Sequence, residues 1–368
     1  MPTVILKQSS YDYGPLREQV FEIMDLLGGR GIGKGSRVIL KPNLLTAAPP
    51  SSAVITHPFV VRAAAEYVLA KGGRPVVADS PAMGSFAGIL KESGISAALR
   101  GMDVECRPFK RPALMDIGEP FGRIELAADI FEADAVINLP KLKTHAFMLL
   151  TLGVKNLFGC VVDFKKPEWH MKLGQERELF ARLLVQICRT VRPRITILDG
   201  ILAMEGNGPG KGGTPREVGL LAASEDPFCL DAEVSRLVGL DPEKLPTHRA
   251  AAGPGAVPPY AVQGEIPLVH DFRIPQAGPQ LTGPGPLNRI VKRHLLQNPL
   301  VDRSLCSRCG KCLEVCPARA VSDEKEIRFD LQKCIRCFCC IEVCPQGAIS
   351  VSESRTRKAV RKLLRGRL

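Results

Sequence analysis

The chain has 368 residues, which is too long for one small domain and suits two or three. Aromatic residues make up only 5% of the chain, and no recognition motif is present, so specific nucleic-acid binding is disfavoured. The formal net charge is +12, and residues 355–367 carry seven lysines or arginines and no acid. This charge suits anionic small molecules, acidic partners or membrane surfaces.

The distribution of the 13 cysteines indicates a reducing compartment. Nine of them lie between Cys306 and Cys344, unlike the spread expected of a secreted disulfide scaffold. The N-terminal sequence MPTVILKQSS lacks a basic segment followed by a long apolar stretch, so no signal peptide is predicted. No apolar run approaches the roughly 18 residues that cross a bilayer. We therefore expect a cytoplasmic protein.

The first 250 residues are expected to form an α/β domain, because short β-rich runs alternate with helical stretches. Strands are predicted at Val4–Lys7, Arg37–Lys41, Pro75–Asp79, Ala135–Leu139, Ile195–Asp199 and Val218–Ala222. Helices are predicted at Leu16–Leu27, Pro58–Ala70, Gln175–Thr190 and Pro227–Val238. Several strands are continuous apolar runs, as in strands buried on both faces. The pattern predicts a mostly parallel sheet covered by helices.

The rest of the chain divides into a connector, a cysteine-rich module and a basic tail. Residues 252–286 contain eight prolines and six glycines without a period, which indicates an extended connector on the surface of the first domain or wrapped around it. A short helix is predicted at Leu287–Gln297. We place the α/β domain at 1–250, the connector and helix at 251–298, the cysteine module at 299–352 and the basic tail at 353–368.

The cysteine module contains two runs of the form C-x2-C-x2-C-x3-C-P, repeated at an offset of 28 residues. This spacing resembles that of bacterial-type ferredoxins with two [4Fe–4S] clusters, which implies electron transfer and a small ferredoxin-like α+β domain. A zinc site is the alternative. Zinc takes one tetrahedral set of four ligands, typically from two separated pairs, and fits two such runs poorly.

The ferredoxin resemblance also implies which cysteines bind each cluster. Three cysteines of a run bind one cluster, and the fourth cysteine, before the proline, binds the other. The first cluster would use Cys306, Cys309, Cys312 and Cys344. The second cluster would use Cys334, Cys337, Cys340 and Cys316. Cys339 lies outside this register and is expected to be a packed free thiol.

Polar side chains follow several of the predicted strands. Ligands of open α/β sheets bind in the crevice at the carboxyl ends of the strands. We therefore expect a shared crevice that contains Lys41, Asn43, Asp79, Lys143, His145 and Asp199. For any one of these residues, a role in capping or in a turn is the alternative. The glycine-rich stretch 204–213 is expected to be either an active-site loop or a plain surface turn.

The same segments resemble the DUF362 family, an uncharacterised domain often joined to a ferredoxin module. The resemblance rests on Lys41-Pro42-Asn43-Leu44-Leu45, Thr56-His57-Pro58, Ala78-Asp79-Ser80-Pro81, Pro140-Lys141-Leu142-Lys143-Thr144-His145, Val154-Lys155-Asn156-Leu157-Phe158-Gly159, Asp199-Gly200, the stretch from Met204 to Pro209, and Asp226 with Asp231-Ala232. It covers roughly residues 1–245 and departs from the family pattern at Ala82, where glycine is expected. It implies an architecture rather than a reaction.

The chemistry of the residues suggests roles within the crevice. Lys41, Lys143 and Lys155, with Asn43 and Asn156, are the candidates for binding a carboxylate or phosphate. His57, His145 and His170 are candidate proton donors or metal ligands, and Asp79, Asp199 and Glu205 are candidate bases. Cys160 suits packing better than nucleophilic attack.

Two functions follow from these observations. The leading hypothesis is an iron–sulfur redox enzyme, an oxidoreductase of anaerobic metabolism, whose α/β domain binds an anionic small molecule. We then expect Lys143→Ala to weaken ligand binding and His145→Ala to impair turnover. The alternative is a non-catalytic relay that docks on a partner. A redox partner protein is implied by both, and the basic tail suits an acidic partner or a membrane surface.

Overall fold

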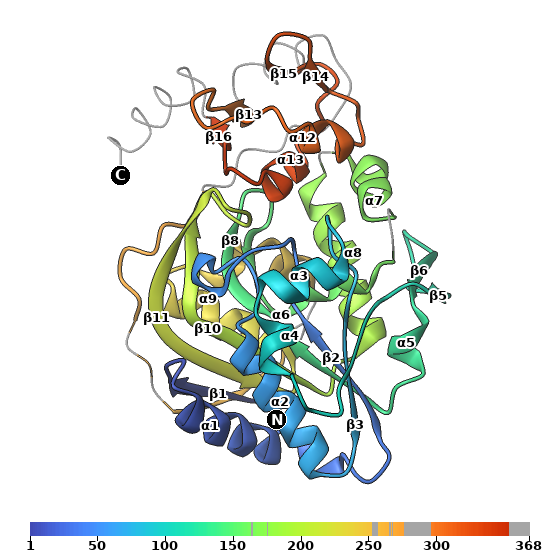
Figure 1. Ribbon diagram of the computed structural model, residues 1–368, viewed down its shortest axis with the longest axis vertical. Coiled ribbons are helices and arrows are strands. Elements are labelled where there is room, and N and C mark those ends of the chain that lie inside the picture. The colour runs from blue at the N-terminus through green and yellow to red at the C-terminus, as the bar shows by residue number, and fades with distance from the viewer. Residues whose placement is uncertain are drawn as a thin grey trace.

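The computed structural model describes residues 1–162, 165–174, 176–251, 257–264, 266, 268–275 and 296–352. The basic tail at 353–368 lies outside these residues, as does the predicted helix Leu287–Gln297 except for its last two positions. Figure 1 shows a large α/β domain and, at one end of it, the small cysteine-rich domain in orange and red. Among the described helices, none has the length and apolar character that a bilayer crossing requires.

One sheet forms the centre of the large domain, with ten strands among the described residues. Its main path runs β12-β1-β11-β10-β7-β2-β3-β4, while β8 pairs with β10 and β9. The strands are β1 (Thr3–Gln8), β2 (Arg37–Pro42), β3 (Arg74–Asp79), β4 (Glu105–Pro108), β7 (Ala135–Leu139), β8 (Lys141–His145), β9 (Leu149–Thr151), β10 (Ile195–Gly206), β11 (Gly213–Ser224) and β12 (Ala261–Gln263).

The sheet is mostly parallel, as the sequence predicts. The neighbours β10, β7, β2, β3 and β4 all run in the same direction, whereas β11 runs antiparallel to both β1 and β10. The central strands are buried along nearly their whole length because helices cover both faces. The carboxyl ends of β2, β3 and β7 therefore meet at one edge, where a ligand site is expected.

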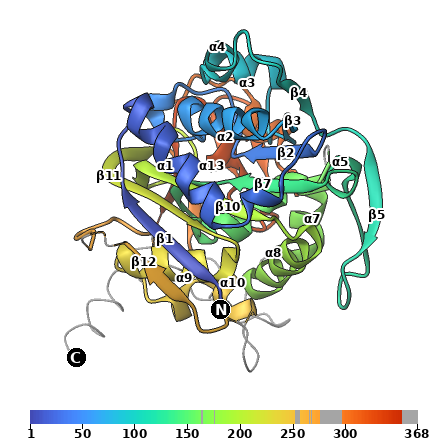
Figure 2. The same ribbon diagram turned by 90° about the horizontal axis from the view of Figure 1, so that it is seen from below.

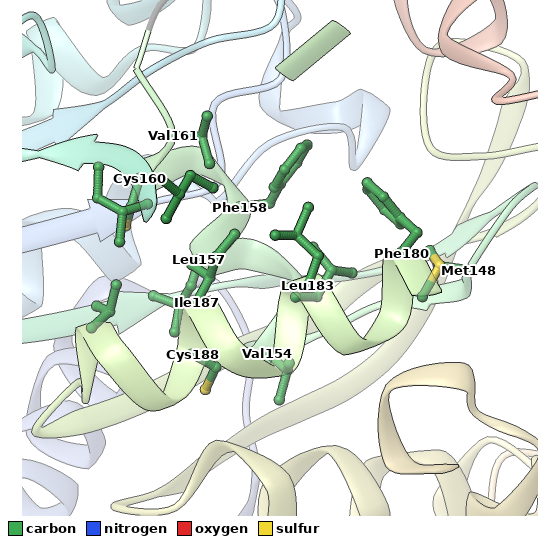
Figure 3. Close-up of a cluster of buried hydrophobic side chains, with 14 of the residues drawn as sticks. Met148, Val154, Leu157, Phe158, Cys160, Val161, Phe180, Leu183, Ile187 and Cys188 are labelled. Atoms are coloured by element: carbon green, nitrogen blue, oxygen red, sulfur yellow. The ribbon is translucent and has the colours of Figure 1, made fainter. Parts of the chain in front are cut away.

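Alternate side chains of a strand pack into two different hydrophobic cores, one on each face of the sheet. Val38 and Leu40 of β2 pack with α1 (Tyr13–Leu26) and α2 (Pro58–Ala70), while Ile39 packs with α8 (Arg177–Val191) on the opposite face. Figure 2 shows these helices on the two sides of the sheet. Figure 3 shows Phe180, Leu183 and Ile187 of α8 beside the turn η3 (Leu157–Cys160).

The other elements of the large domain connect or flank these layers. The helices are α3 (Phe86–Glu92), α4 (Ile95–Ala98), α5 (Ala128–Phe131), α6 (Gly153–Asn156), α7 (Lys165–Leu173), α9 (Pro227–Leu237) and α10 (Pro246–Ala251). Three short turns are η1 (Gly29–Gly31), η2 (Pro50–Ser52) and η4 (Pro242–Lys244). The strands β5 (Pro112–Asp116) and β6 (Arg123–Ala127) form a separate hairpin.

Two segments differ from the sequence-based expectation. Residues 141–145 are a strand, β8, rather than a loop, because they pair with β9 and with the long strand β10. β10 itself continues to Gly206, so Glu205 lies within a strand. Alternation of the polar residues Lys141, Lys143 and His145 has the period of a strand, but nothing in the sequence identifies the strands with which they pair.

The small domain consists of two short antiparallel pairs and two helical turns. Its elements are β13 (Asn298–Val301), α12 (Lys311–Glu314), β14 (Val321–Asp323), β15 (Ile327–Phe329), α13 (Cys339–Val343) and β16 (Ile349–Ser352). β13 pairs with β16, and β14 pairs with β15. Buried Phe338, Ile341 and Ile349 belong to the same apolar cluster as Phe180 of α8. Apolar packing is therefore continuous between the domains.

The glycine-rich stretch 204–213 includes the turn between β10 and β11, and this turn packs against the small domain. Asn207 Nδ2 donates a hydrogen bond of 3.0 Å to Ile349 O. A Cβ at Gly210 would lie 2.7 Å from Glu342 O and 2.8 Å from Ile341 O. Only glycine lets the two backbones approach this closely. The stretch is thus an interdomain contact, which neither expectation from the sequence included.

Candidate functional site

A cavity of about 610 Å³ lies between the two domains. On the side of the large domain it is lined by the ends of β2 and β3, by β8 and by α6. On the other side it is lined by residues of α12 and α13. This volume is in the range of small-molecule sites, and the position is the carboxyl edge of the sheet.

The structure brings together only part of the predicted crevice. All five candidates for anion binding line the cavity, namely Lys41, Asn43, Lys143, Lys155 and Asn156. Among the five candidate catalytic residues, only Asp79 lines it, whereas His57, His145, Asp199 and Glu205 do not. His170, which the sequence singles out less strongly, is a lining residue.

Lys41 and Asp79 form a buried ion pair at the edge of the cavity. Lys41 Nζ lies 2.9 Å from Asp79 Oδ1, and both side chains are almost completely buried. The carboxylate also accepts hydrogen bonds from Leu44 N (3.0 Å) and Ser80 N (2.8 Å). Gly159 packs directly against the pair, where a Cβ would clash with both side chains. Both carboxylate oxygens of Asp79 therefore have partners, and the ion pair links the ends of β2 and β3.

A chain of hydrogen bonds fixes Lys143. Its Nζ donates to Asn43 Oδ1 (2.8 Å) and Val54 O (2.6 Å). Asn43 Nδ2 donates to Asn156 Oδ1, and Asn156 Nδ2 donates to Asn138 Oδ1, each at 2.8 Å. Burial, followed by the charge of Lys155, lowers the pKa of Lys143 to about 7. An anion in the cavity would restore the charged form of this lysine.

The short helix α6, which carries Lys155, begins at a residue pair bound by Asp231, a residue that is not among the candidate site residues of the sequence analysis. Buried Asp231 of α9 accepts hydrogen bonds from Gly153 N (2.7 Å) and Val154 N (3.0 Å) at the start of α6. Burial raises the pKa of Asp231 to about 8, although these two N–H donors favour its charged form. Asp231 lies in the DUF362-like motif, which was the signal for its importance.

His57 and Asp199 belong to a separate buried cluster with Lys141 and Tyr11. Asp199 Oδ2 accepts from Lys141 Nζ (2.8 Å), and Asp199 Oδ1 accepts from Tyr11 OH (2.7 Å). Tyr11 OH also accepts a hydrogen bond from Leu202 N, where the register of β10 against β11 shifts. The cluster satisfies the backbone at this bulge. Asp199 therefore does not share the crevice with Lys41 and Lys143.

His145 connects the two domains. Its Nδ1 accepts hydrogen bonds from Phe147 N (3.0 Å) and Met148 N (3.2 Å), so the neutral ring carries its proton on Nε2. Nε2 then donates to Glu342 Oε1 of the small domain at 2.8 Å. Burial, followed by the charge of Lys155, lowers the pKa of His145 to about 4. This geometry suits a domain contact rather than proton transfer to a ligand.

Glu205 binds the connector to the large domain. Its carboxylate pairs with Arg216 Nη1 (2.9 Å) and with Arg273 Nε (2.6 Å) of the connector. Burial opposes the charged form, but hydrogen bonds from both arginines hold the pKa of Glu205 below its usual value. The connector also contributes the edge strand β12, which its composition did not predict. Glu205 is thus an anchor in this structure rather than a free base.

The ferredoxin-like cysteines surround two small cavities. We call Cys306, Cys309, Cys312 and Cys344 the outer cysteine set, and they line one of these cavities. We call Cys316, Cys334, Cys337 and Cys340 the inner cysteine set, and they line the other. Each set thus takes three cysteines from one run and the fourth from the other. Ala320 N donates to Cys316 Sγ (3.3 Å), and Ala348 N donates to Cys344 Sγ (3.2 Å).

This donor chemistry fits iron–sulfur clusters, whose thiolates accept such N–H donors. In the part of the chain that the structure describes, no three His, Cys, Asp or Glu side chains converge as ligands of a single metal ion. When bound, a [4Fe–4S] cluster supplies one-electron transfer.

The large cavity and the inner cysteine set share one wall. Cys339, at the start of α13, lines both the large cavity and the cavity of the inner cysteine set. Glu314 and Val315, which immediately precede Cys316 of that set, line the large cavity too. Cys339 is buried, as expected for a packed thiol. Cys339 is therefore a single residue that lies between the lysine-lined cavity and the inner cysteine set.

Comparisons with known proteins agree with this architecture. The family model described as "Domain of unknown function (DUF362)" matches residues 38–236, which is more than half of the chain. The chain belongs to the DUF362 family. A 4Fe-4S dicluster domain matches residues 298–345, in the order that the sequence resemblance predicts. The cysteine-rich domain is therefore a ferredoxin-type domain with a 4Fe-4S cofactor and an iron–sulfur electron-transfer role.

Two individual proteins are similar to this DUF362 protein. Thylakoid-associated protein sll1697 of Synechocystis sp. is 42% identical over 268 residues, which cover 72% of this chain and 83% of the relative. A structure of the lactate racemase apoprotein from Thermoanaerobacterium thermosaccharolyticum is 12% identical, with a TM-score of 0.39. That match covers 61% of this chain, which spans about half (54%) of the racemase chain. The expected cytoplasmic location stays a prediction.

Proposed function

We propose that this DUF362 protein is an oxidoreductase with two [4Fe–4S] clusters, in which the cavity between the domains holds an anionic small molecule. The observation that carries the proposal is the shared wall at Cys339, between the cavity and the inner cysteine set. A ligand in this cavity is separated from the inner cluster by one side chain. That proximity favours electron exchange between the cluster and the ligand.

The charge of the cavity supports an anionic ligand. The five lysines of the lining outnumber its three carboxylates, which belong to Asp79, Glu314 and Glu342. Asp79 is paired with Lys41, and Glu342 accepts a hydrogen bond from the neutral His145. Lys155 binds and orients the ligand at the wall next to Cys339, and Lys143 adds a second positive charge. A negative charge that develops on the ligand during reduction is stabilised by both ammonium groups.

A redox partner protein is proposed to dock near the outer cysteine set. Cys309 of this set is exposed, whereas Cys337 of the inner set is buried. Electrons are therefore exchanged with the partner at the outer side and with the small molecule at the inner side. In this proposal the basic tail adds a contact to an acidic partner or a membrane surface.

The proposal is tested by identifying the ligand and then measuring whether it accepts or donates electrons. Anaerobically purified protein is extracted, and mass spectrometry compares the small molecules bound by wild type, Lys155→Gln and the control Lys34→Gln. Lys34 is an exposed lysine before β2, outside the cavity lining. We expect an organic anion that is retained by wild type and Lys34→Gln but lost from Lys155→Gln.

The isolated anion is then mixed with dithionite-reduced protein, and the visible absorbance of the clusters is followed without oxygen. Recovery of the absorbance, with stoichiometric conversion of the anion, is the expected result if the anion is the oxidised substrate. If the purified molecule is the reduced product, the oxidised protein is bleached instead. An anion that does neither, or a cavity that retains no anion, contradicts the enzyme proposal and favours the relay.

A further inference from the structure

Among the described residues, Thr151 Oγ1 is a buried atom of the cavity lining without a hydrogen-bond partner, and Lys155 and His170 line the same cavity. Thr151 is 2% exposed and His170 is 7% exposed, so water outside the cavity does not reach them freely. Leaving the buried Thr151 hydroxyl unpaired costs about 1–3 kcal/mol. An unpaired hydroxyl in a cavity that is also lined by a lysine and a histidine points to a ligand that accepts hydrogen bonds from these groups.

The three groups come from separate elements that are each fixed by packing. Thr151 ends β9, and Lys155 lies in α6, whose first N–H groups are bound by Asp231. His170 of α7 stacks on Phe180, with ring centroids 4.5 Å apart, and contacts the edge of Phe158. A site built from fixed side chains is organised before a ligand binds.

All three groups are able to donate a hydrogen bond to the ligand. Lys155 provides an ammonium group, Thr151 a hydroxyl and His170 an imidazole N–H. Burial lowers the pKa of His170 to about 4, so near neutral pH its ring is uncharged and has one N–H. One cation with two neutral donors matches the single charge and the two oxygens of a carboxylate.

Other features of the lining favour a carboxylate over a phosphate. Among the described lining residues there is no arginine, the side chain that most often binds phosphate oxygens in pairs. The lining also includes the apolar side chains of Phe109, Phe158 and Val343, and the Glu342 carboxylate, bound by His145, acts electrostatically on Lys155 and His170. A ligand that satisfies both features has a carboxylate at one end and an apolar body.

We propose that Thr151, Lys155 and His170 form a carboxylate subsite, and that the ligand of the cavity is an amphipathic carboxylate. The carboxylate lies against Lys155 at the wall that Cys339 forms, and the apolar body lies against Phe109 and Phe158. This inference rests on the proposed function for its ligand, but it concerns binding alone and no electron transfer is needed to test it.

The test uses isothermal titration calorimetry on the anaerobically purified, iron-loaded protein with benzoate as the probe. Benzamide is the matched neutral probe, and phenyl phosphate is the alternative anion. The variants are Thr151→Val, which keeps the shape of the side chain, and Lys155→Gln, with Lys34→Gln as the control outside the cavity. Visible absorbance confirms that each variant carries its clusters.

We expect benzoate to bind to wild type and to Lys34→Gln with equal affinity. Each subsite variant is expected to weaken benzoate binding at least about tenfold, the equivalent of one lost hydrogen bond to a charged group. Benzamide and phenyl phosphate should bind more weakly than benzoate. Equal binding of benzoate by Thr151→Val, Lys155→Gln and wild type overturns the subsite, as does tighter binding of phenyl phosphate or no binding of benzoate.

The same data separate the subsite from the proposed function. If benzoate binding depends on Thr151 and Lys155, the subsite stands even when no carboxylate exchanges electrons with the protein, and only the redox proposal then fails. If a purified anion does exchange electrons with the protein but benzoate binding is insensitive to both variants, the redox proposal stands and the subsite fails.

Discussion

Replacing Gly210 with alanine should loosen the contact between the two domains. In the wild type, an added Cβ would lie 2.7 Å from Glu342 O and 2.8 Å from Ile341 O of α13. Ordinary contact begins at 3.4 Å, so the backbones must separate by about 0.7 Å. Both contacts are with backbone carbonyl oxygens, which cannot move aside as the end of a flexible side chain could. Overpacking of this kind costs about 1–3 kcal/mol.

The strain of Gly210→Ala is relieved most easily by moving the small domain, which also opens the cavity. The assay is urea unfolding without oxygen, followed by circular dichroism for the large domain and by visible absorbance for the clusters. In wild type we expect the two transitions to coincide, and in Gly210→Ala the cluster transition should come at lower urea. Gly33→Ala is the control, since a Cβ there meets nothing within 4 Å. Coincident, unshifted transitions in Gly210→Ala would refute the interdomain contact.

Further predictions concern the clusters, a buried lysine and the tail. Anaerobically purified protein should contain about eight irons and eight sulfides per chain, and Cys316→Ser should lower both by about half; zinc without iron would exclude the ferredoxin assignment. Between pH 7 and 10 the free energy of unfolding should rise more steeply with pH in wild type than in Lys143→Met. The two slopes should differ by at most about 1.4 kcal/mol per pH unit. Burial, Lys155 and Lys141 lower the pKa of Lys143 in the folded protein to about 7, although Glu342 and Asp79 raise it. Between pH 7 and 10 the unfolded chain therefore binds more protons at this lysine than the folded protein does, and stability rises with pH. Circular dichroism in urea measures both slopes, and equal slopes would contradict this pKa. Deleting residues 355–368 should leave the iron content unchanged while weakening adsorption to anionic vesicles or an acidic partner; loss of iron on deletion would make the tail a structural element.

The sequence predicted the strands and helices of the large domain well, because their signals are local. The helix Pro58–Ala70 and the strand Ala135–Leu139 have the expected bounds. Parallel strands end at the same edge, so the expectation that Lys41 and Lys143 lie together also followed from the order of elements. These two lysines do line one cavity.

The catalytic candidates were harder to place, because their positions depend on pairing between distant segments. Asp199 is the last residue of a predicted strand, but β10 continues past it, and its carboxylate is bound by Lys141 and Tyr11. His145 lies in the predicted segment, yet its partner Glu342 is 197 residues away in the small domain. No local pattern indicates such a pair. Likewise, only the packing of the small domain reveals that Cys339 adjoins the cavity.

The central claim is that a ligand cavity adjoins the inner of two iron–sulfur clusters. The most direct test is a crystal structure of the anaerobic, iron-loaded protein soaked with 4-iodobenzoate, with anomalous data for both iron and iodine. We predict iron peaks within both cysteine sets and an iodine peak in the cavity, with the carboxylate at Lys155 and Thr151. Iron in only one cysteine set, or iodine bound only outside the cavity, would contradict the account.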